Sequence, residues 1–201
     1  MESIAVVLVA FLLGSIPTAY LMGRALKGID VRDAGSGNSG ALNAGRQLGK
    51  GVGVLVLALD AGKGVLALVI GQALQVPTLT LYVAAVLAVA GHNYSPFLRF
   101  RGGKGAATVL GISALMLWQI TAIAVLAGVF LLVVTRRPVW TMAGVFVLLN
   151  ILTIATAQSA GLIALCLVLS FMVAAVHFSR QRADLLPALK SGDWRRIMNT
   201  D

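Results

Sequence analysis

The sequence predicts an all-α integral membrane protein, a compact bundle of about seven transmembrane helices in one membrane domain spanning residues 1–201. Hydrophobic residues make up 59% of the chain and charged residues 11%, whereas a soluble domain carries about 25% charged residues. The mean hydropathy is +0.93. The apolar stretches are long and continuous, which is typical of membrane helices and unlike the short alternating strands of a membrane β-barrel.

Five stretches are long enough to cross a bilayer, which takes about 20 apolar residues. They are Ile4–Leu26, Val52–Leu74, Thr78–Leu98, Val139–Thr156 and Ala160–Phe178. A sixth stretch, Ala106–Thr135, is either one long helix or two short ones. The chain begins with Glu2 as its first charge and shows no signal-peptide cleavage site, so we expect the first stretch to remain as a span.

The distribution of the basic residues decides between one helix and two in that sixth stretch. The formal net charge is +9, and nearly all Lys and Arg residues flank the apolar spans. If the chain turns near Leu117–Thr121, every basic cluster lies on the same side of the membrane, as the positive-inside rule requires. We therefore predict seven spans, with the N-terminus outside, the C-terminus in the cytoplasm, and the basic clusters on the cytoplasmic face.

A first glycine-rich segment follows the first span and reads Gly35-Ser36-Gly37-Asn38-Ser39-Gly40. Glycines let neighbouring backbone N–H groups converge on an anion, and a nearby arginine can clamp it. The G-x-x-x-x-G-K-[ST] spacing of a nucleotide-binding loop is absent. A solvated cytoplasmic loop is the alternative. The phosphate-site interpretation takes Ser36 as a catalytic residue and assigns substrate binding to Gly35, Gly37, Asn38, Gly40, Asn43 and Arg46.

A second glycine-rich segment, Gly102-Gly103-Lys104-Gly105, opens directly into an apolar helix. The N-terminus of a helix favours a phosphate through its free N–H groups and its dipole. We assign catalytic roles to Lys104 and to His92, which precedes this segment near the membrane surface, although a lone histidine also occurs as an ordinary hydrogen-bonding residue. The same pocket is expected to use Gly102, Gly103, Gly105 and Thr108 for substrate binding.

Two charged residues, Asp60 and Lys63, lie inside the second span, where charges are costly and are usually paired or functional. They are one helical turn apart and could pair with each other. Alternatively, Lys63 faces the phosphate pocket and binds substrate while Asp60 orients basic groups. In the first span, Pro17 is expected to kink the helix.

These motifs resemble those of the bacterial acyl-phosphate:glycerol-3-phosphate acyltransferases of the PlsY type. The matching stretches, in the family's order and spacing, are Leu13–Pro17, Gly35–Asn43 with Arg46, Leu59-Asp60 with Lys63-Gly64, and Gly91-His92 through Ser95–Phe97 to Gly102–Thr108. The resemblance implies an inner-membrane enzyme of seven helices. It would move a fatty acyl group from acyl phosphate to the 1-hydroxyl of sn-glycerol 3-phosphate, giving lysophosphatidic acid and phosphate, without a metal, nucleotide or acyl carrier.

The C-terminal tail departs from the family pattern. By our alignment Gln181 and Asp184 stand where the family has His and Asn, and Leu42 stands where the family has Thr. We assign Gln181 and Asp184 to substrate binding on this alignment. The departures also leave open a diverged, non-catalytic paralogue.

The predicted partners are acyl phosphate, glycerol 3-phosphate and membrane lipid, with no nucleic acid, cofactor or metal, and we expect a monomer. Acyl phosphate is already activated, so we expect direct transfer without an acyl-enzyme, with either the leaving phosphate or His92 as the base. A transporter of a phosphorylated solute is the main rival, although transporter sites lie near the membrane midplane. A metal-dependent lipid head-group enzyme would need a carboxylate cluster, and the seven acidic residues here are scattered.

Overall fold

The computed structural model describes residues 1–191, apart from the side chains at 183–185 and 187–190. Every regular element within this part of the chain is a helix. The chain divides into two compact units, Met1–Leu115 and Met116–Asp201. The single membrane domain expected from the sequence stays a prediction.

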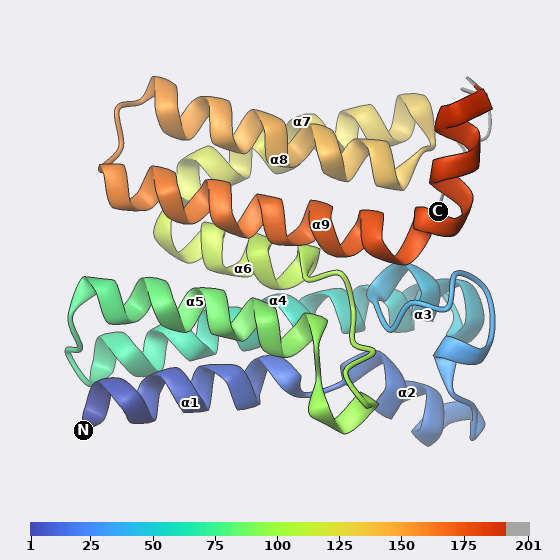
Figure 1. The fold of residues 1–201 in the computed structure, drawn as a ribbon, viewed down its shortest axis with the longest axis horizontal. Helices are drawn as coiled ribbons and strands as arrows, with labels where there is room; N and C mark the ends of the chain where they lie inside the picture. The colour runs from blue at the N-terminus through green and yellow to red at the C-terminus, as the bar shows by residue number, and fades with distance from the viewer. Residues whose placement is uncertain (192–201) are drawn as a thin grey trace. The chain divides into compact units, whose positions relative to one another are not determined.

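The first unit is built around three helices that run side by side: α1 (Glu2–Ser15), α4 (Lys50–Ala73) and α5 (Thr78–Asn93) (Figure 1). Small residues let them approach closely. A Cβ atom at Gly14 of α1 would overlap the backbone of Ala88 on α5, and one at Gly91 of α5 would overlap the backbone of Phe11 on α1. The unit is completed by α6 (Ala106–Met116), whose Gly111 packs in the same way against Ala61 of α4.

Shorter helices gather at the end of this unit away from the N-terminus, as Figure 1 shows for α2 (Thr18–Lys27) and α3 (Ala41–Leu48). A buried apolar cluster joins them to α4 and to the 3-10 helix η1 (Val31–Asp33): it consists of Ala19, Val31, Ala44 and Val56. A second 3-10 helix, η2 (Pro96–Leu98), follows α5. Both glycine-rich segments are therefore loops attached to a packed helical framework.

The first apolar stretch contains a complete break between two helices, where the sequence predicted only a kink. The helix stops at Ser15 and restarts at Thr18, with Pro17 at the N-cap of α2. Proline cannot donate a backbone hydrogen bond, and its ring disfavours helix in the residue before it. The predicted span Ile4–Leu26 is thus two helices, although Glu2–Lys27 as a whole is apolar enough to cross a membrane.

The second unit contains α7 (Trp118–Thr135), α8 (Pro138–Ala155) and α9 (Ala160–Ser191), and α8 packs against both of its neighbours. Gly128 of α7 lies against Val145 of α8. Between α8 and α9, the side-chain amide of Asn150 donates to the hydroxyl of Ser170 at 2.7 Å. Interhelical bonds of this kind stabilise helix pairs in a membrane.

The ambiguous stretch Ala106–Thr135 forms two helices, separated at Leu117, within the predicted turn Leu117–Thr121. Six helices in the described part of the chain are long and apolar enough to span a membrane, and α6 is a shorter apolar helix of 11 residues. The helical membrane architecture is confirmed. The count of seven spans and the orientation of the termini stay predictions.

Candidate functional site

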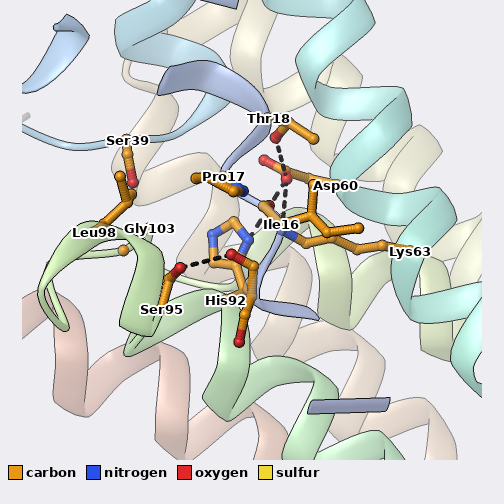
Figure 2. Close-up of a pocket in the computed structure, with 12 residues that line it drawn as sticks. Ile16, Pro17, Thr18, Ser39, Asp60, Lys63, His92, Ser95, Leu98 and Gly103 are labelled. Atoms are coloured by element: carbon orange, nitrogen blue, oxygen red, sulfur yellow. Dashed lines mark hydrogen bonds and ion pairs between the residues drawn. The ribbon is translucent and has the colours of Figure 1, made fainter. Parts of the chain in front are cut away.

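A small polar pocket opens in the first unit, where the break between α1 and α2 meets α4, α5 and both glycine-rich segments (Figure 2). Segments far apart in the sequence therefore share one site, as the sequence analysis expected. The pocket is lined by Ser15, Ile16, Pro17, Thr18, Ser39, Asp60, Lys63, His92, Ser95, Leu98, Gly102 and Gly103.

Asp60 of α4 is the centre of the polar contacts in this pocket. Its Oδ1 accepts a hydrogen bond from the hydroxyl of Thr18 at 2.5 Å and lies 2.9 Å from Nζ of Lys63. Nδ1 of His92 faces the same oxygen at 3.6 Å. Asp60, Lys63 and His92 are all buried. The structural pairing of Asp60 with Lys63 is confirmed, and both residues also line the pocket, so the two interpretations of this pair are compatible.

The buried ion pair also stabilises the break in the first span. The carbonyl oxygen of Ile16 accepts the N–H of Thr18 at 3.1 Å and Nζ of Lys63 at 3.0 Å. A backbone carbonyl freed from a helix must find a partner when water is scarce. Lys63 therefore supplies a hydrogen-bond donor for the Ile16 carbonyl, which the break at Pro17 leaves without a helical partner. Asp60 compensates the charge of Lys63.

The first glycine-rich segment is shaped from inside by Asn43 of α3. Its buried amide nitrogen donates to the carbonyls of Val31, Ala34 and Asn38 at 2.7, 3.2 and 3.0 Å, and its Oδ1 accepts the N–H of Ser36 at 3.2 Å. Gly35 and Gly37 have φ of +63° and +65°, where glycine is favoured. Asn43 thus acts as the organiser of the loop, and its predicted contact with substrate stays a prediction.

Within this segment, Ser39 is the residue that lines the pocket. Ser36 and Arg46 are exposed and Asn38 is half-buried, while Gly40 leaves no room for a Cβ beside the Asn38 amide. The structure thus brings the segment to the pocket through Ser39, which the sequence analysis did not single out, and places the predicted catalytic Ser36 on the accessible side of the loop.

The second glycine-rich segment is packed against the end of α5. The N–H groups of Gly102 and Gly103 donate to the carbonyls of Asn93 and His92 at 3.2 and 2.9 Å, so these two groups are directed at α5 and not at the pocket. A Cβ at Gly103 would overlap Nε2 of His92, and one at Gly102 would overlap the backbone of α5. Gly102 and Gly103 are therefore required because there is no space for a side chain at either position.

The remaining predicted residues of this segment lie beside the pocket without lining it. Lys104 is half-buried, and Gly105 has φ of +85° with Asn93 Oδ1 against it. Thr108 is fully buried in the first turn of α6, where it lies against Gly64 of α4. Gln181 is half-buried in α9 of the second unit, and the side chain of Asp184 lies outside the described residues.

Arg32 connects η1 to η2, the two 3-10 helices that precede the first and the second glycine-rich segment. The guanidinium of Arg32 binds Asp30 through Nη2 at 2.6 Å and donates from Nη1 to the carbonyl of Leu98 at 3.0 Å. It also lies over the ring of Tyr20, 5.5 Å from the ring centroid. The hydrogen bond from Arg32 holds the pKa of the Asp30 carboxyl below its usual value of 3.8, and Asp30 raises the pKa of Arg32.

Four hydroxyl residues line the pocket without a site role assigned to them from the sequence: Ser15, Thr18, Ser39 and Ser95. The Ser95 hydroxyl donates to the carbonyl of Ser15 at 2.6 Å, which ties α5 to the end of α1. A proline within an apolar span was the available signal, because the groups freed by a helix break need polar partners. Among the described residues, no group of three or more His, Cys, Asp or Glu side chains could hold a metal ion.

The fold and site define a helical membrane protein with a buried, charged pocket at the meeting point of two glycine-rich loops. The sequence model of the family "Glycerol-3-phosphate acyltransferase" matches residues 4–186, and the chain belongs to this family. It is 39% identical over 173 residues to glycerol-3-phosphate acyltransferase 1 of Deinococcus radiodurans, a match covering 76% of this chain and 87% of that one.

Two further comparisons agree. The chain is 55% identical over 103 residues to glycerol-3-phosphate acyltransferase 2 of Moorella thermoacetica, and this match spans about half of each protein, 51% and 53%. A crystal structure of PlsY, an integral membrane glycerol 3-phosphate acyltransferase in its glycerol 3-phosphate form, superposes with a TM-score of 0.83 at 28% identity. It covers 96% of this chain and 94% of that one. The lysophosphatidic acid form of PlsY gives a TM-score of 0.81.

Proposed function

We propose that this protein transfers a fatty acyl group from acyl phosphate to the 1-hydroxyl of sn-glycerol 3-phosphate, giving lysophosphatidic acid and inorganic phosphate. The observation that carries the proposal is the convergence of both glycine-rich segments on the Asp60–Lys63–His92 pocket. The family and the two PlsY structures, named for their glycerol 3-phosphate and lysophosphatidic acid forms, support the acceptor and the product. The choice of acyl phosphate as donor rests on the resemblance of the motifs.

The reaction proceeds in one displacement. The glycerol O1 attacks the acyl carbonyl carbon and forms the new ester bond, while the bond from that carbon to the phosphate oxygen breaks. The phosphate leaves with the bonding electrons, and the hydroxyl proton ends on the released phosphate. Because the leaving group is already good, the protein's task is to orient two anionic substrates and compensate their charge.

The predicted residues divide between these tasks. Ser36, Asn38, Arg46 and the loop glycines Gly35, Gly37 and Gly40 bind one phosphate from the accessible side of the first segment. Lys104 compensates the charge of the other, and Thr108 and Gly105 are assigned from the sequence to binding it. His92 and Lys63 form the polar wall of the pocket. The family alignment adds Gln181 and Asp184 as glycerol 3-phosphate contacts.

In the decisive experiment, the protein is purified in detergent and incubated with palmitoyl phosphate and glycerol 3-phosphate. Released phosphate and 1-acylglycerol 3-phosphate are both measured. We expect the two products in a 1:1 ratio, dependent on both substrates and unaffected by EDTA. Palmitoyl phosphate alone tests for an acyl-enzyme, and we expect no protein acylation. If no acylglycerol phosphate is formed, the proposed function is rejected. A transporter would form none, because it does not catalyse acyl transfer and cannot transport a solute in detergent.

We also propose that the protein is a monomer of the bacterial inner membrane and that the pocket faces the cytoplasm. Support comes from the basic residues of the first unit, which flank α2, α3 and the end of α5 and so lie on the pocket side.

Cysteine labelling tests this orientation. The single cysteine, Cys166, is buried. A Cys166→Ser background therefore permits reporter cysteines at exposed Ser36 and at exposed Gln75 in the α4–α5 loop. We expect an impermeant thiol reagent added to intact cells to label position 75 and not position 36.

A further inference from the structure

Among the described residues that line the pocket, Asp60 is the one carboxylate, and the reaction proposed above gives it no task. It lies on α4 between side chains from two other helices, Thr18 of α2 and His92 of α5, and it also contacts Lys63 on its own helix (Figure 2). A carboxylate needed only to neutralise Lys63 would not have to face a third element of the fold.

The His92 ring is confined on both of its nitrogen-bearing sides. Nδ1 faces Asp60 Oδ1 at 3.6 Å, while Nε2 lies against Gly103, where a Cβ atom would overlap it. The main-chain oxygen of His92 accepts the N–H of Gly103 at 2.9 Å. The imidazole therefore lies between the carboxylate of α4 and the second glycine-rich segment.

We propose that Asp60 is a positioning residue that acts through His92. Its carboxylate keeps the proton of the neutral imidazole on Nδ1 and thereby leaves Nε2, the nitrogen beside Gly103, as the accepting nitrogen. The partner of one imidazole nitrogen sets the tautomer and thus the role of the other. The link to acyl transfer rests on the proposed function, whereas the effect on the imidazole does not.

The test uses a pair of substitutions because Asp60→Asn alone leaves the buried ammonium of Lys63 uncompensated, which can prevent folding. The double variant Asp60→Asn with Lys63→Met removes both charges at nearly constant volume. Thr18→Val is the matched control, since it deletes another hydrogen bond to Asp60 Oδ1 and leaves the Asp60–His92 contact in place. Thermal unfolding in detergent checks that each variant is folded.

The primary measurement is the ¹⁵N NMR spectrum of histidine-labelled protein. The chain has only two histidines, and the signals lost in His92→Gln identify His92. We expect the Nδ1–H form of His92 in wild type and in Thr18→Val, and a mixture of tautomers in the double variant. An unchanged Nδ1–H signal in the folded double variant would overturn the proposal, as would an Nε2–H form in wild type.

The second measurement is acyl transfer. We expect kcat/KM of the double variant to fall about 10- to 100-fold below that of Lys63→Met alone, so that the loss is assigned to Asp60; this is the range known for partners that orient a metal-ligating histidine. A changed tautomer with unchanged turnover would also overturn the positioning role. If wild type transfers no acyl group at all, the proposed function fails while the NMR result still decides what Asp60 does to His92.

Discussion

The two glycine-rich segments, residues 35–40 and 102–105, look alike in the sequence and are held by opposite means. The first is exposed at Gly35–Gly37 and is shaped by the buried amide of Asn43, which binds three backbone carbonyls and one N–H. The second is largely buried and is shaped by α5, whose last carbonyls accept its N–H groups. One loop has an internal support, and the other is pressed against a helix.

The difference shows that glycine is needed for different reasons in the two loops. Gly35 and Gly37 adopt positive φ, so their requirement is conformational. Gly102 and Gly103 lack that conformation but have no space for a side chain. The accessible first loop is suited to admit a substrate phosphate, whereas the second forms a rigid wall beside His92.

Gly103→Ala should have the largest effect. The added methyl group would overlap Nε2 of His92 and displace either the ring or the loop. Displacing a reacting group by about 1 Å can lower turnover by about 100-fold, and we expect a loss of that order in acyl transfer with palmitoyl phosphate.

The matched control is Gly51→Ala in the first turn of α4, where a Cβ would meet nothing within 4 Å. It should retain wild-type turnover and unfold at the same temperature or slightly higher, because alanine favours the helix. Comparable losses in both variants would show that the second loop is not confined as described.

Asn43→Asp tests the support of the first loop. This nearly isosteric change replaces the donor amide by a carboxylate that faces the carbonyls of Val31, Ala34 and Asn38. Loss of satisfied buried polar groups costs about 1–3 kcal/mol, which for a chain of this size is a fall in Tm of about 5 °C. We expect that shift together with about a tenfold loss of activity.

Gln47→Ala is the comparison for that change. Gln47 donates to two of the same carbonyls, those of Val31 and Ala34, but comes from the edge of the loop. Its removal leaves the Asn43 bonds intact and should shift Tm by less than half as much. An equal shift would mean that the support is shared and that Asn43 has no special position.

Arg32→Gln tests the connection between η1 and η2, the two 3-10 helices that precede the loops. It removes the bond to the Leu98 carbonyl and the ion pair with Asp30. A partly exposed ion pair is worth about 1 kcal/mol or less, so we expect no more than about a fivefold loss of kcat/KM for glycerol 3-phosphate. Arg24→Gln is the control, because Arg24 contacts the same Tyr20 ring but its side chain donates to Gly28 and not to Leu98 of η2. This variant should keep kcat/KM within about twofold of wild type.

Much of this fold was predictable, because hydropathy and basic clusters are long-range patterns that need no knowledge of contacts. They predicted the helical membrane class and the separation at Leu117. The meeting of the two segments was also predicted, since both follow spans and lie in stretches that contain basic residues. The complete break at Pro17 was not, because whether a proline kinks or ends a helix depends on partners such as Lys63 that satisfy the freed groups.

The pocket's composition was harder to predict than its location. Thr18 lies outside the glycine-rich motifs, and only the packing of α2 and the first loop brings Thr18 and Ser39 to Asp60 and His92. The direction of the Gly102 and Gly103 amides was likewise invisible, because a glycine pair can point its N–H groups at an anion or at a neighbouring helix. Sequence pattern gives the chemistry available, and tertiary contacts decide which atoms are used.

The smallest effect we predict is a pH dependence that originates at Asp30. Arg32 lowers the pKa of Asp30 below its ordinary 3.8, so the carboxylate form is favoured by folding. For a lowered pKa the stabilisation is complete above the unfolded value and is lost as the pH falls through the folded value. Tm of the wild-type protein should therefore be unaffected by this group between pH 8 and about 5 and should fall below about pH 4.

Asp30→Asn isolates this contribution. At pH 7 the variant should unfold about 1–3 °C below wild type, because a partly exposed pair is worth about 1 kcal/mol or less. As the pH falls below the folded pKa, Asp30 of the wild type becomes protonated and the two unfolding temperatures should converge. Arg32, the partner of Asp30, also donates to the Leu98 carbonyl of η2, which precedes the second loop, so activity should follow the same trend. A difference in Tm that stayed constant from pH 7 to pH 3 would show that Asp30 acts by shape and not by charge.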